Sequence, residues 1–157
     1  MRFMAGFLAG FFSLALLIVG AGIWASAKAD LWLVSTVASW HEKDNGYNEQ
    51  NFGLGFEYGI SDSTRLTVGQ YRNSFYRNSI YGALQTKWFC GVLVVQVCAA
   101  TAAGFVSGYN GQYEEVYSPM VVPVVTVEGR HLGANLMVIP GLGGSGWIFG
   151  LQVKGRW

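Results

Sequence analysis

The closing segment of the chain alternates strictly between apolar residues and polar or small ones. Its apolar positions are Trp147, Phe149, Leu151, Val153 and Trp157. One apolar and one wet face over about ten residues is typical of a β-strand, and an aromatic end is typical of a strand that meets the membrane interface. A half-buried strand of a soluble β-sandwich has the same alternation, so this segment alone does not separate the two folds.

The start of the chain favours the membrane alternative. Arg2 precedes a long apolar run and a small-x-small exit that ends at Ala27. These are the parts of a secretory signal peptide. We expect residues 1–27 to be a signal peptide, cleaved after Ala27 or alternatively after Ala29, and residues 28–157 to be one outer-membrane β-barrel domain. Because the apolar run is long for a signal, an uncleaved anchor is the other interpretation.

The remaining chain divides into eight segments with strand character. The clearest alternates apolar residues with small ones and places the carboxylate of Glu57 on the small-residue face. The apolar run that contains Gln96 is shorter than the roughly 20 residues of a transmembrane helix, so it is assigned as a strand. We predict an all-β fold, an eight-stranded antiparallel up-and-down transmembrane β-barrel. The expected strands are 32–42, 52–60, 64–73, 78–88, 92–107, 117–128, 131–139 and 146–157.

Composition agrees with a lipid-facing exterior. Charged residues make up 12% of the chain and aromatic residues 15%, and there are 22 glycines. So few charges are unusual for a soluble domain of this size. The net charge of +1 gives no basic field for nucleic acid, so we expect no nucleic-acid partner.

The two cysteines, Cys90 and Cys98, are eight positions apart. In one extended strand that spacing is roughly 26 Å, and on one helix about 12 Å. A disulfide needs Cα atoms within about 7 Å. We therefore expect two free thiols.

Strand parity places the connections on the two sides of the membrane. Both termini of a bacterial outer-membrane barrel are periplasmic, so the first strand runs outward. The expected surface loops are 42–51, 74–77, 108–116 and 140–146. The expected periplasmic turns are 61–63, 89–91 and 129–130. The predicted location is the bacterial outer membrane.

Candidate chemistry gathers at the outer rim. His41 ends the first expected strand, Asn73 and Ser74 end the third, and Tyr47-Asn48-Glu49 lies between them in sequence. An imidazole, a hydroxyl and carboxylates at one rim could supply a general base and a polarised nucleophile. Polar residues also belong at the rim of any barrel, where they face water. The simplest interpretation of the nearby tyrosines is an interface belt. They are Tyr47, Tyr71, Tyr76 and Tyr81.

No metal site is expected here, because the acidic residues near His41 have no metal-ligand spacing. The other histidine, His131, begins a strand at the periplasmic end and is interpreted as a turn residue.

Several motifs follow one another along the chain. They are Trp40-His41, Tyr47-Asn48-Glu49, Phe52-Gly53-Leu54-Gly55-Phe56, Asn73-Ser74, Pro123 and Val138-Ile139-Pro140-Gly141. Over nearly the whole mature chain, their order and spacing resemble the PagP family of lipid A palmitoyltransferases.

This resemblance implies an eight-stranded barrel that encloses an acyl pocket and moves a palmitoyl chain from the sn-1 position of a phospholipid to lipid A. It implies an active site at His41, Asn73 and Ser74, and a lateral lipid gate at the flanks of Pro123 and Pro140. The gate has a physical basis, because proline has no N–H to donate to a β-ladder.

We therefore expect an outer-membrane acyltransferase acting on lipid A or a related surface lipid. In it His41 is the general base, Ser74 polarises or positions it, and Asn73 orients His41. The partners are phospholipid and lipopolysaccharide, the protein is a monomer, and no cofactor is needed. The alternative is a non-catalytic PagP-like barrel with a structural, lipid-binding or surface-interaction role, since Asn73 stands where the family has an acid. A lipid esterase with Ser74 as nucleophile is a third interpretation.

Overall fold

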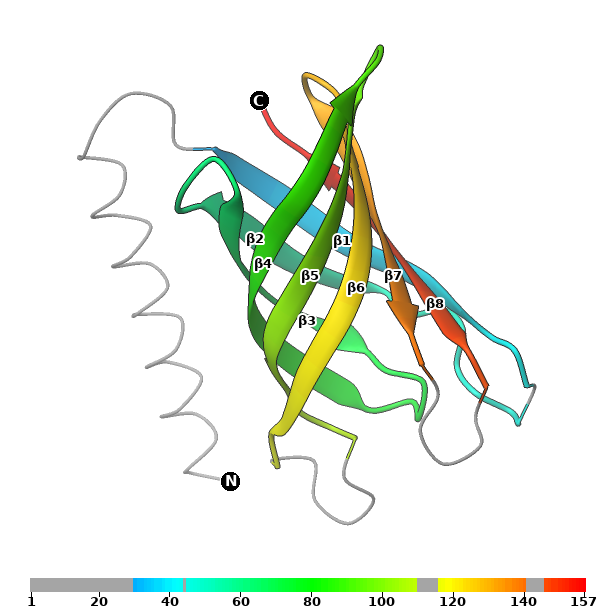
Figure 1. Cartoon of the computed structure of the whole chain (residues 1–157). Helices are drawn as coiled ribbons and strands as arrows, with labels where there is room; N and C mark the ends of the chain where they lie inside the picture. Colours follow the sequence, from blue (N-terminus) through cyan, green and yellow to red (C-terminus); the bar gives the residue numbers. More distant parts are fainter. Residues whose placement is uncertain (1–29, 44, 110–115, 141–145) are drawn as a thin grey trace, which may run out of the picture. The chain divides into compact units, whose positions relative to one another are not determined.

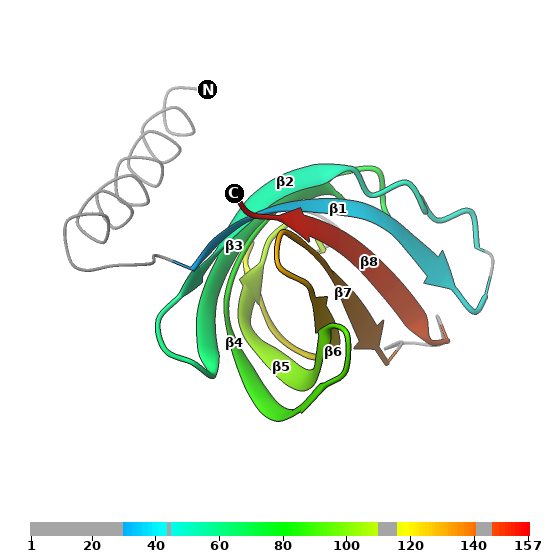
Figure 2. The same cartoon turned by 90° about the horizontal axis from the view of Figure 1, so that it is seen from above.

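The computed structural model describes residues 30–43, 45–109, 116–140 and 146–157, and the predicted signal peptide lies outside them. Eight antiparallel strands close into a barrel in sequence order (Figures 1 and 2). They are β1 (Leu31–His41), β2 (Gly53–Gly59), β3 (Thr64–Arg72), β4 (Asn78–Val92), β5 (Gln96–Val106), β6 (Ser118–Glu128), β7 (Leu132–Ile139) and β8 (Ile148–Gly155). The predicted fold class is confirmed.

Period-two alternation forms the barrel wall. In β2 and the residue before it, Phe52, Leu54 and Phe56 are exposed outside, while Glu57 is fully buried in the lumen. In β8, Phe149 and Val153 are exposed and Lys154 is buried. The protein thus has the apolar outer surface of a membrane barrel. Within the described ranges, no helix has the length and apolar character needed to cross a membrane.

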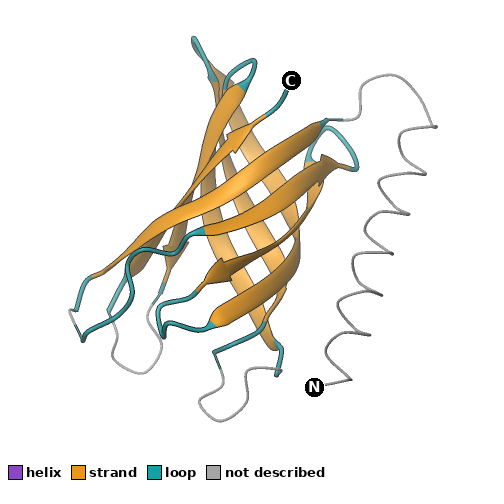
Figure 3. Cartoon of the chain, turned by 180° about the vertical axis from the view of Figure 1, so that it is seen from behind, coloured by secondary structure: helices purple, strands orange, loops and turns teal. Residues whose placement is uncertain are grey.

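The connections divide between two ends of the barrel. Strands β1, β3, β5 and β7 all finish at one end, which we call the loop end, as Figure 3 shows from behind. The other end, called the turn end, holds the start of β1, the end of β8 and three short turns (Figure 1). This arrangement matches the predicted strand parity. The assignment of the loop end to the cell surface and of the turn end to the periplasm stays a prediction.

The β4–β5 hairpin differs from the prediction. β4 runs to Val92 and β5 begins at Gln96, so the turn lies at residues 93–95 and not at 89–91. Cys90 and Cys98 are register partners across this hairpin, with Cα atoms 4.1 Å apart, and form a disulfide. The prediction of free thiols is wrong. Its distances assumed one continuous element, whereas a turn between the cysteines brings them face to face.

Two seams of the wall are only partly laddered. The ladder between β6 and β7 runs from Glu128–Gly133 to Val124–Met137 and stops there. Among the described residues, none of Ser118–Pro123 on β6 pairs with Val138–Ile139 on β7, although each stretch pairs with its other neighbour. We call this stretch the β6–β7 opening. The β1–β2 ladder likewise ends at Thr36–Gly53.

Candidate active site

His41 and Ser74 meet at the loop end of the barrel. His41 is the last residue of β1, and Ser74 lies just after β3. The imidazole Nε2 is 3.0 Å from the Ser74 Oγ, within hydrogen-bond distance. The His41 side chain is only 1% exposed, and Ser74 is also buried. The structure therefore brings together two of the three predicted active-site residues.

Aromatic side chains enclose the imidazole. The Tyr47 ring stacks on it at 4.5 Å between centroids and 28° between planes. The Phe75 ring meets Tyr47 edge-on at 5.8 Å. Such contacts fix the ring orientation of a histidine, because the stacked face leaves little room for rotation. Tyr47 is thus part of the site, and the prediction that it belongs to an interface belt is wrong.

Asn48 ties the β1–β2 loop to the β3–β4 loop. Its backbone N–H donates to the Ser74 carbonyl at 2.9 Å, and its side-chain amide donates to the Asn73 carbonyl at 3.1 Å. Since Asn48 is buried, these bonds form out of contact with water. They hold the backbone at Ser74 against the loop that leads away from His41, which explains why two residues 33 positions apart meet.

Asn73 has a different role from the predicted one. Its fully buried amide donates to Ser79 Oγ and the Gly108 carbonyl, each at 3.0 Å. Its Oδ1 accepts from the backbone N–H groups of Phe75 and Arg77 at 2.9 and 3.0 Å. An amide has two donors and two acceptor positions, so its capacity is filled. Asn73 therefore organises the β3–β4 loop, and it has no hydrogen bond left with which to orient His41.

A carboxylate approaches the other side of the imidazole. Glu49 Oε1 lies 3.7 Å from His41 Nδ1 and 3.2 Å from the His41 backbone nitrogen, from which it accepts a hydrogen bond. His41 Nδ1 is buried and makes no hydrogen bond. The motif Tyr47-Asn48-Glu49 thus surrounds the histidine: one member stacks on it, one fixes the neighbouring loop, and one places a carboxylate beside it.

Two further aromatic residues extend this cluster. The Tyr109 hydroxyl lies 2.8 Å from the Tyr71 hydroxyl, and the Tyr109 ring meets Phe75 edge-on at 5.9 Å. Tyr71 and Tyr81 also meet edge-on at 5.9 Å, and Tyr81 is buried. The predicted belt role is therefore wrong for Tyr71 and Tyr81 as well. Phe75 and Tyr109 were not predicted from sequence, because single loop residues carry no periodic signal.

The side of the lumen formed by β4, β5, β6 and β7 contains a buried apolar cluster, whereas Gln152 hydrogen-bonds to Thr36 and Tyr81 on the opposite side. Five small or branched side chains form its buried cluster: Ala83, Ala100, Ala102, Val122 and Val124. Met120, Met137 and Ile139 pack against this cluster and are partly buried. Val122 and Ile139 belong to the stretches of β6 and β7 that border the β6–β7 opening. The buried apolar cluster therefore borders the β6–β7 opening.

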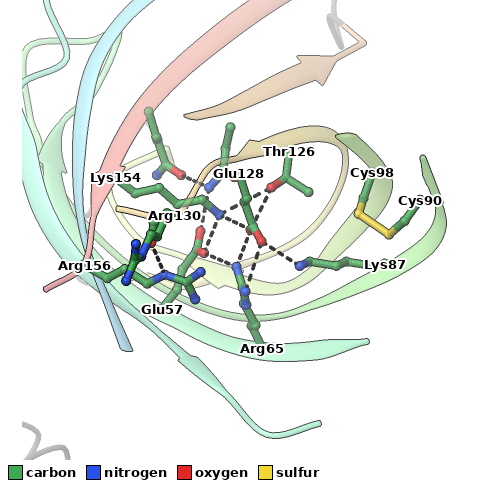
Figure 4. A network of polar contacts seen from close by, with 12 residues as sticks. Glu57, Arg65, Lys87, Cys90, Cys98, Thr126, Glu128, Arg130, Lys154 and Arg156 are labelled. Carbon is green, nitrogen blue, oxygen red and sulfur yellow. Dashed lines mark hydrogen bonds and ion pairs between the residues drawn. A yellow bond between two sulfur atoms is a disulfide. The ribbon is translucent and has the colours of Figure 1, made fainter. Parts of the chain in front are cut away.

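The lumen toward the turn end is filled by charges (Figure 4). Lys154 Nζ lies 2.8 Å from Glu57 and 2.7 Å from Glu128. Arg65 contacts both carboxylates, at 3.4 Å for Glu57, and Lys87 lies 2.9 Å from Glu128. Every one of these side chains is at most 7% exposed. We call this network the charged floor.

Trp32 lies against the charged floor and is fully buried. The charged groups of Arg156, Lys154 and Arg65 lie 4.4, 5.2 and 5.7 Å from its ring centre, within cation–π range. An eight-stranded barrel has room for side chains or one small ligand, and at the turn end this room is occupied by the charged floor and Trp32.

The two predicted gate prolines lie at the β6–β7 opening. Pro123 is an outward-facing residue of β6, and it pairs with Thr101 of β5 on its other side. It directly precedes Val124, where the β6–β7 ladder ends. Pro140 follows the last residue of β7 and is exposed. Neither can donate a backbone hydrogen bond across the opening. That a lipid passes through the β6–β7 opening stays a prediction.

Comparison with known proteins gives little further information. No protein-family model and no curated protein match the chain. Among solved structures, the N-terminal β-barrel domain of Pseudomonas aeruginosa OprF is similar, with 14% sequence identity and a TM-score of 0.47. The match covers 82% of this chain and 98% of that domain. The resemblance to the PagP family thus rests on the motifs of the sequence.

Proposed function

We propose that this protein is an acyltransferase of the bacterial outer membrane, which moves a fatty acyl chain from a phospholipid to a hydroxyl group of lipid A or a related surface lipid. The observation that carries the proposal is the 3.0 Å contact between the buried His41 Nε2 and the Ser74 Oγ. The resemblance to the PagP family supports the same reaction at the same residues.

The pair has the groups that an acyl transfer needs. His41 Nε2 accepts the proton of the acceptor hydroxyl, and the hydroxyl oxygen attacks the ester carbonyl of the phospholipid. The tetrahedral intermediate then breaks its bond to the glycerol oxygen. That oxygen takes the proton back from His41 and leaves as a lysophospholipid. Ser74 positions the imidazole and polarises it through Oγ.

The buried apolar cluster in the lumen supports the choice of an acyl substrate. An acyl chain gains about 0.8 kcal/mol for each CH₂ group that leaves water for apolar surroundings. The buried cluster around Val122 and Val124 supplies such surroundings below the rim. The β6–β7 opening, beside Pro123 and Pro140, gives a lipid tail a lateral path from the membrane to this lining. The charged floor limits how deep the chain can reach.

The proposed orientation places the loop end at the cell surface, where lipopolysaccharide lies in the outer leaflet. Phospholipid and lipopolysaccharide are the expected partners, and a single barrel contains every residue that the reaction uses. No cofactor enters the reaction, because base catalysis by the imidazole needs none.

The non-catalytic alternative also has an observation in its favour. The four hydrogen bonds of Asn73 are those of a loop-organising residue, so no acid occupies that position of the site. A barrel that only binds lipid would keep the apolar lining and would not depend on His41. The third interpretation, an esterase, would pass through an acyl group on Ser74 Oγ.

Mass spectrometry of lipid A from cells with and without the protein tests the proposal. We expect one additional acyl chain on lipid A in cells that contain the wild type. Loss of the added chain is expected for His41→Ala and Ser74→Ala. The matched controls are His131→Ala and Ser61→Ala, which change the same residue types at the turn end and should keep the added chain.

Three other outcomes would count against the proposal. If lipid A gains no chain and no fatty acid is released, the non-catalytic alternative holds. If His41→Ala adds the chain as the wild type does, the imidazole is not the base. If free fatty acid is released and an acyl group can be trapped on Ser74, the protein is an esterase.

A further inference from the structure

We infer that Glu49 is the positioning residue that holds the His41 imidazole in its working orientation and tautomer, the role expected from sequence for Asn73. The inference rests on the proposed function, in which His41 Nε2 accepts a proton. It assigns a carboxylate to a site that otherwise contains only an imidazole and a hydroxyl.

The geometry places one carboxylate oxygen beside two nitrogens of the same residue. Glu49 Oε1 accepts a hydrogen bond from the His41 backbone N–H at 3.2 Å and lies 3.7 Å from Nδ1. Nδ1 is buried and has no hydrogen-bond partner, a costly state for a polar atom. A small rotation of the carboxylate would bring Oε1 within hydrogen-bond distance of Nδ1. Such bonds are often long in free enzymes and shorten in the substrate complex.

Glu49 is held at the backbone, although its side chain is 51% exposed. Its carbonyl accepts a hydrogen bond from the Ser39 N–H at 2.9 Å, on the same strand as His41. The neighbouring Asn48 is anchored to the β3–β4 loop. The backbone that carries the carboxylate is thus held on both sides, within reach of His41.

The other described side-chain contacts of His41 involve the ring face and Nε2, so Glu49 is the residue placed to orient the imidazole through Nδ1. Tyr47 covers a face of the ring, and Ser74 occupies Nε2. Asn73 has used its whole hydrogen-bonding capacity elsewhere. With the proton on Nδ1 facing Glu49, Nε2 is the acceptor nitrogen; the Ser74 hydroxyl donates to it in the free protein, and the acceptor hydroxyl of the substrate takes that place in the reaction. When Nε2 takes the substrate proton, the carboxylate stabilises the imidazolium charge.

Nitrogen-15 NMR of the full-length protein in detergent micelles tests the inference without an activity assay. In alkaline buffer, where histidine is neutral, the two ring-nitrogen shifts report which nitrogen carries the proton. We expect the Nδ1–H form of His41 in the wild type and a mixture of forms in Glu49→Ala. His131, the only other histidine, is an internal reference that should not change.

Glu42→Gln is the matched control. Glu42 is another exposed carboxylate of the same loop, and its Oε2 accepts from the Trp147 N–H at 2.8 Å. Glutamine keeps that acceptor, so the variant removes one rim charge without altering the His41 contacts. The wild-type tautomer in Glu42→Gln and mixed forms in Glu49→Ala support the inference. Wild-type shifts in both variants, or mixed forms in both, overturn it.

Kinetics give the second readout. We expect Glu49→Ala to lower kcat by about 100-fold while KM changes by less than about twofold, because the carboxylate acts on the base and not on substrate binding. Glu49→Asp should recover part of kcat. An unchanged kcat, or an equal rise in KM, would show that Glu49 only shapes the loop and would overturn the inference. If the wild type transfers no acyl chain, the proposed function fails, and the NMR comparison still decides whether Glu49 positions His41.

Discussion

Single residues at the loop end divide into those that present reacting atoms and those that hold loops in place. His41 and Ser74 present an imidazole nitrogen and a hydroxyl at 3.0 Å. Asn48 and Asn73 hold the two loops that carry them, through buried amide hydrogen bonds. The site therefore depends on residues that never touch a substrate, and their loss should affect folding of the loops before it affects chemistry.

Asn73→Asp, which introduces an acid at the position where the PagP family has one, should destabilise the protein. The carboxylate oxygen that replaces Nδ2 would face the Gly108 carbonyl, where the amide donates at 3.0 Å. An acceptor buried against an acceptor costs about 1–3 kcal/mol, and more for a charged group. Urea unfolding in detergent or lipid vesicles should show this loss of free energy of unfolding.

The matched control for that experiment is Asn78→Asp, a change of the same kind at an exposed position near the same loop. It should change the free energy of unfolding by less than about 0.5 kcal/mol. Equal stability of the two variants would mean that the Asn73 amide does not organise the loop.

The sequence predicted the identity of the His41–Ser74 pair but not the roles around it. The resemblance to the PagP family predicted both residues as members of one site, and the structure places them within hydrogen-bond distance. The saturation of Asn73 was not predictable, because two of its partners, Ser79 and Gly108, lie on other segments of the chain. The approach of Glu49 to Nδ1 depends likewise on how a loop folds back on β1.

At the scale of strands, the wall is defined by where its ladders stop. β6 pairs with β5 along eleven positions and with β7 along five. A strand without a partner on one side exposes unpaired backbone N–H and C=O groups. These groups are costly in the hydrocarbon of a membrane, so such a gap suggests a functional role. Two prolines at this opening remove donors that would otherwise be left unpaired.

Closing the β6–β7 opening should block transfer. Continuing the register beyond Val124–Met137 would bring Val122 opposite Ile139. When the double variant Val122→Cys/Ile139→Cys is oxidised, we expect the rate of acyl transfer to fall by tenfold or more, which corresponds to about 1.4 kcal/mol in the activation barrier. Reduction should restore the rate. The assay is the rate of acyl transfer before and after reduction.

The control pair is Val125→Cys/Leu136→Cys, two register partners inside the existing ladder. Its cross-link changes nothing at the opening, so oxidised and reduced forms should transfer equally. If the first pair stays active when fully cross-linked, lipid does not enter between β6 and β7.

The disulfide should stabilise the β4–β5 hairpin locally. Cys90 and Cys98 close a loop only eight positions long, worth about 2–3 kcal/mol at most in the chain-entropy model. Both thiols should resist alkylation until a reductant is added. Reduction should then speed amide hydrogen exchange at residues 91–97 and leave β1 and β8 unchanged. Rapid alkylation without reductant would contradict the bond.

Strand number and most strand boundaries were predictable, because alternation is a property of neighbouring residues. The boundary between β4 and β5 was not. Its turn contains Leu93 and Val94, both highly exposed, and lacks the glycine, proline or asparagine that usually marks a turn. The turn was therefore predicted at 89–91, a few residues too early. The free-thiol prediction had a separate cause, because its distances were those within a single strand or helix.

The whole molecule is organised along the barrel axis. The imidazole–hydroxyl pair lies at the loop end, a buried apolar cluster lines the β4–β7 side of the lumen, and the charged floor fills the turn end. Alternation predicted that Glu57 would point into the lumen. Its partner Arg65 lies eight positions away, on the next strand. Lys154 was not predictable as a partner, because it is 97 positions away on β8 and meets Glu57 only when the barrel closes.

Lys154→Met should destabilise the barrel strongly. Its ammonium group lies between the carboxylates of Glu57 and Glu128 and is fully buried, so its removal leaves buried negative charge with less compensation. Breaking such a pair costs about 3–5 kcal/mol. Unfolding by urea, followed by the fluorescence of tryptophans such as Trp32, measures this cost.

The control variant is Lys43→Met, which removes the same charge from an exposed loop position and should have little effect. Adding Glu57→Gln to Lys154→Met should recover part of the lost stability, since without Lys154 the buried Glu57 carboxylate keeps, among the described residues, only the longer contact with Arg65 as an ion pair. Similar stability of the two single lysine variants would show that the charged floor does not hold the strands together.

The most direct test of the central claim uses purified protein in mixed micelles that contain lipid A and a phospholipid with an isotope-labelled sn-1 acyl chain. Mass spectrometry follows the label. The proposal predicts labelled lipid A and an equal amount of lysophospholipid with the wild type, and neither product with His41→Ala or Ser74→Ala. A wild type that leaves the label on the phospholipid, or a His41→Ala variant that transfers it as fast, would contradict the proposal.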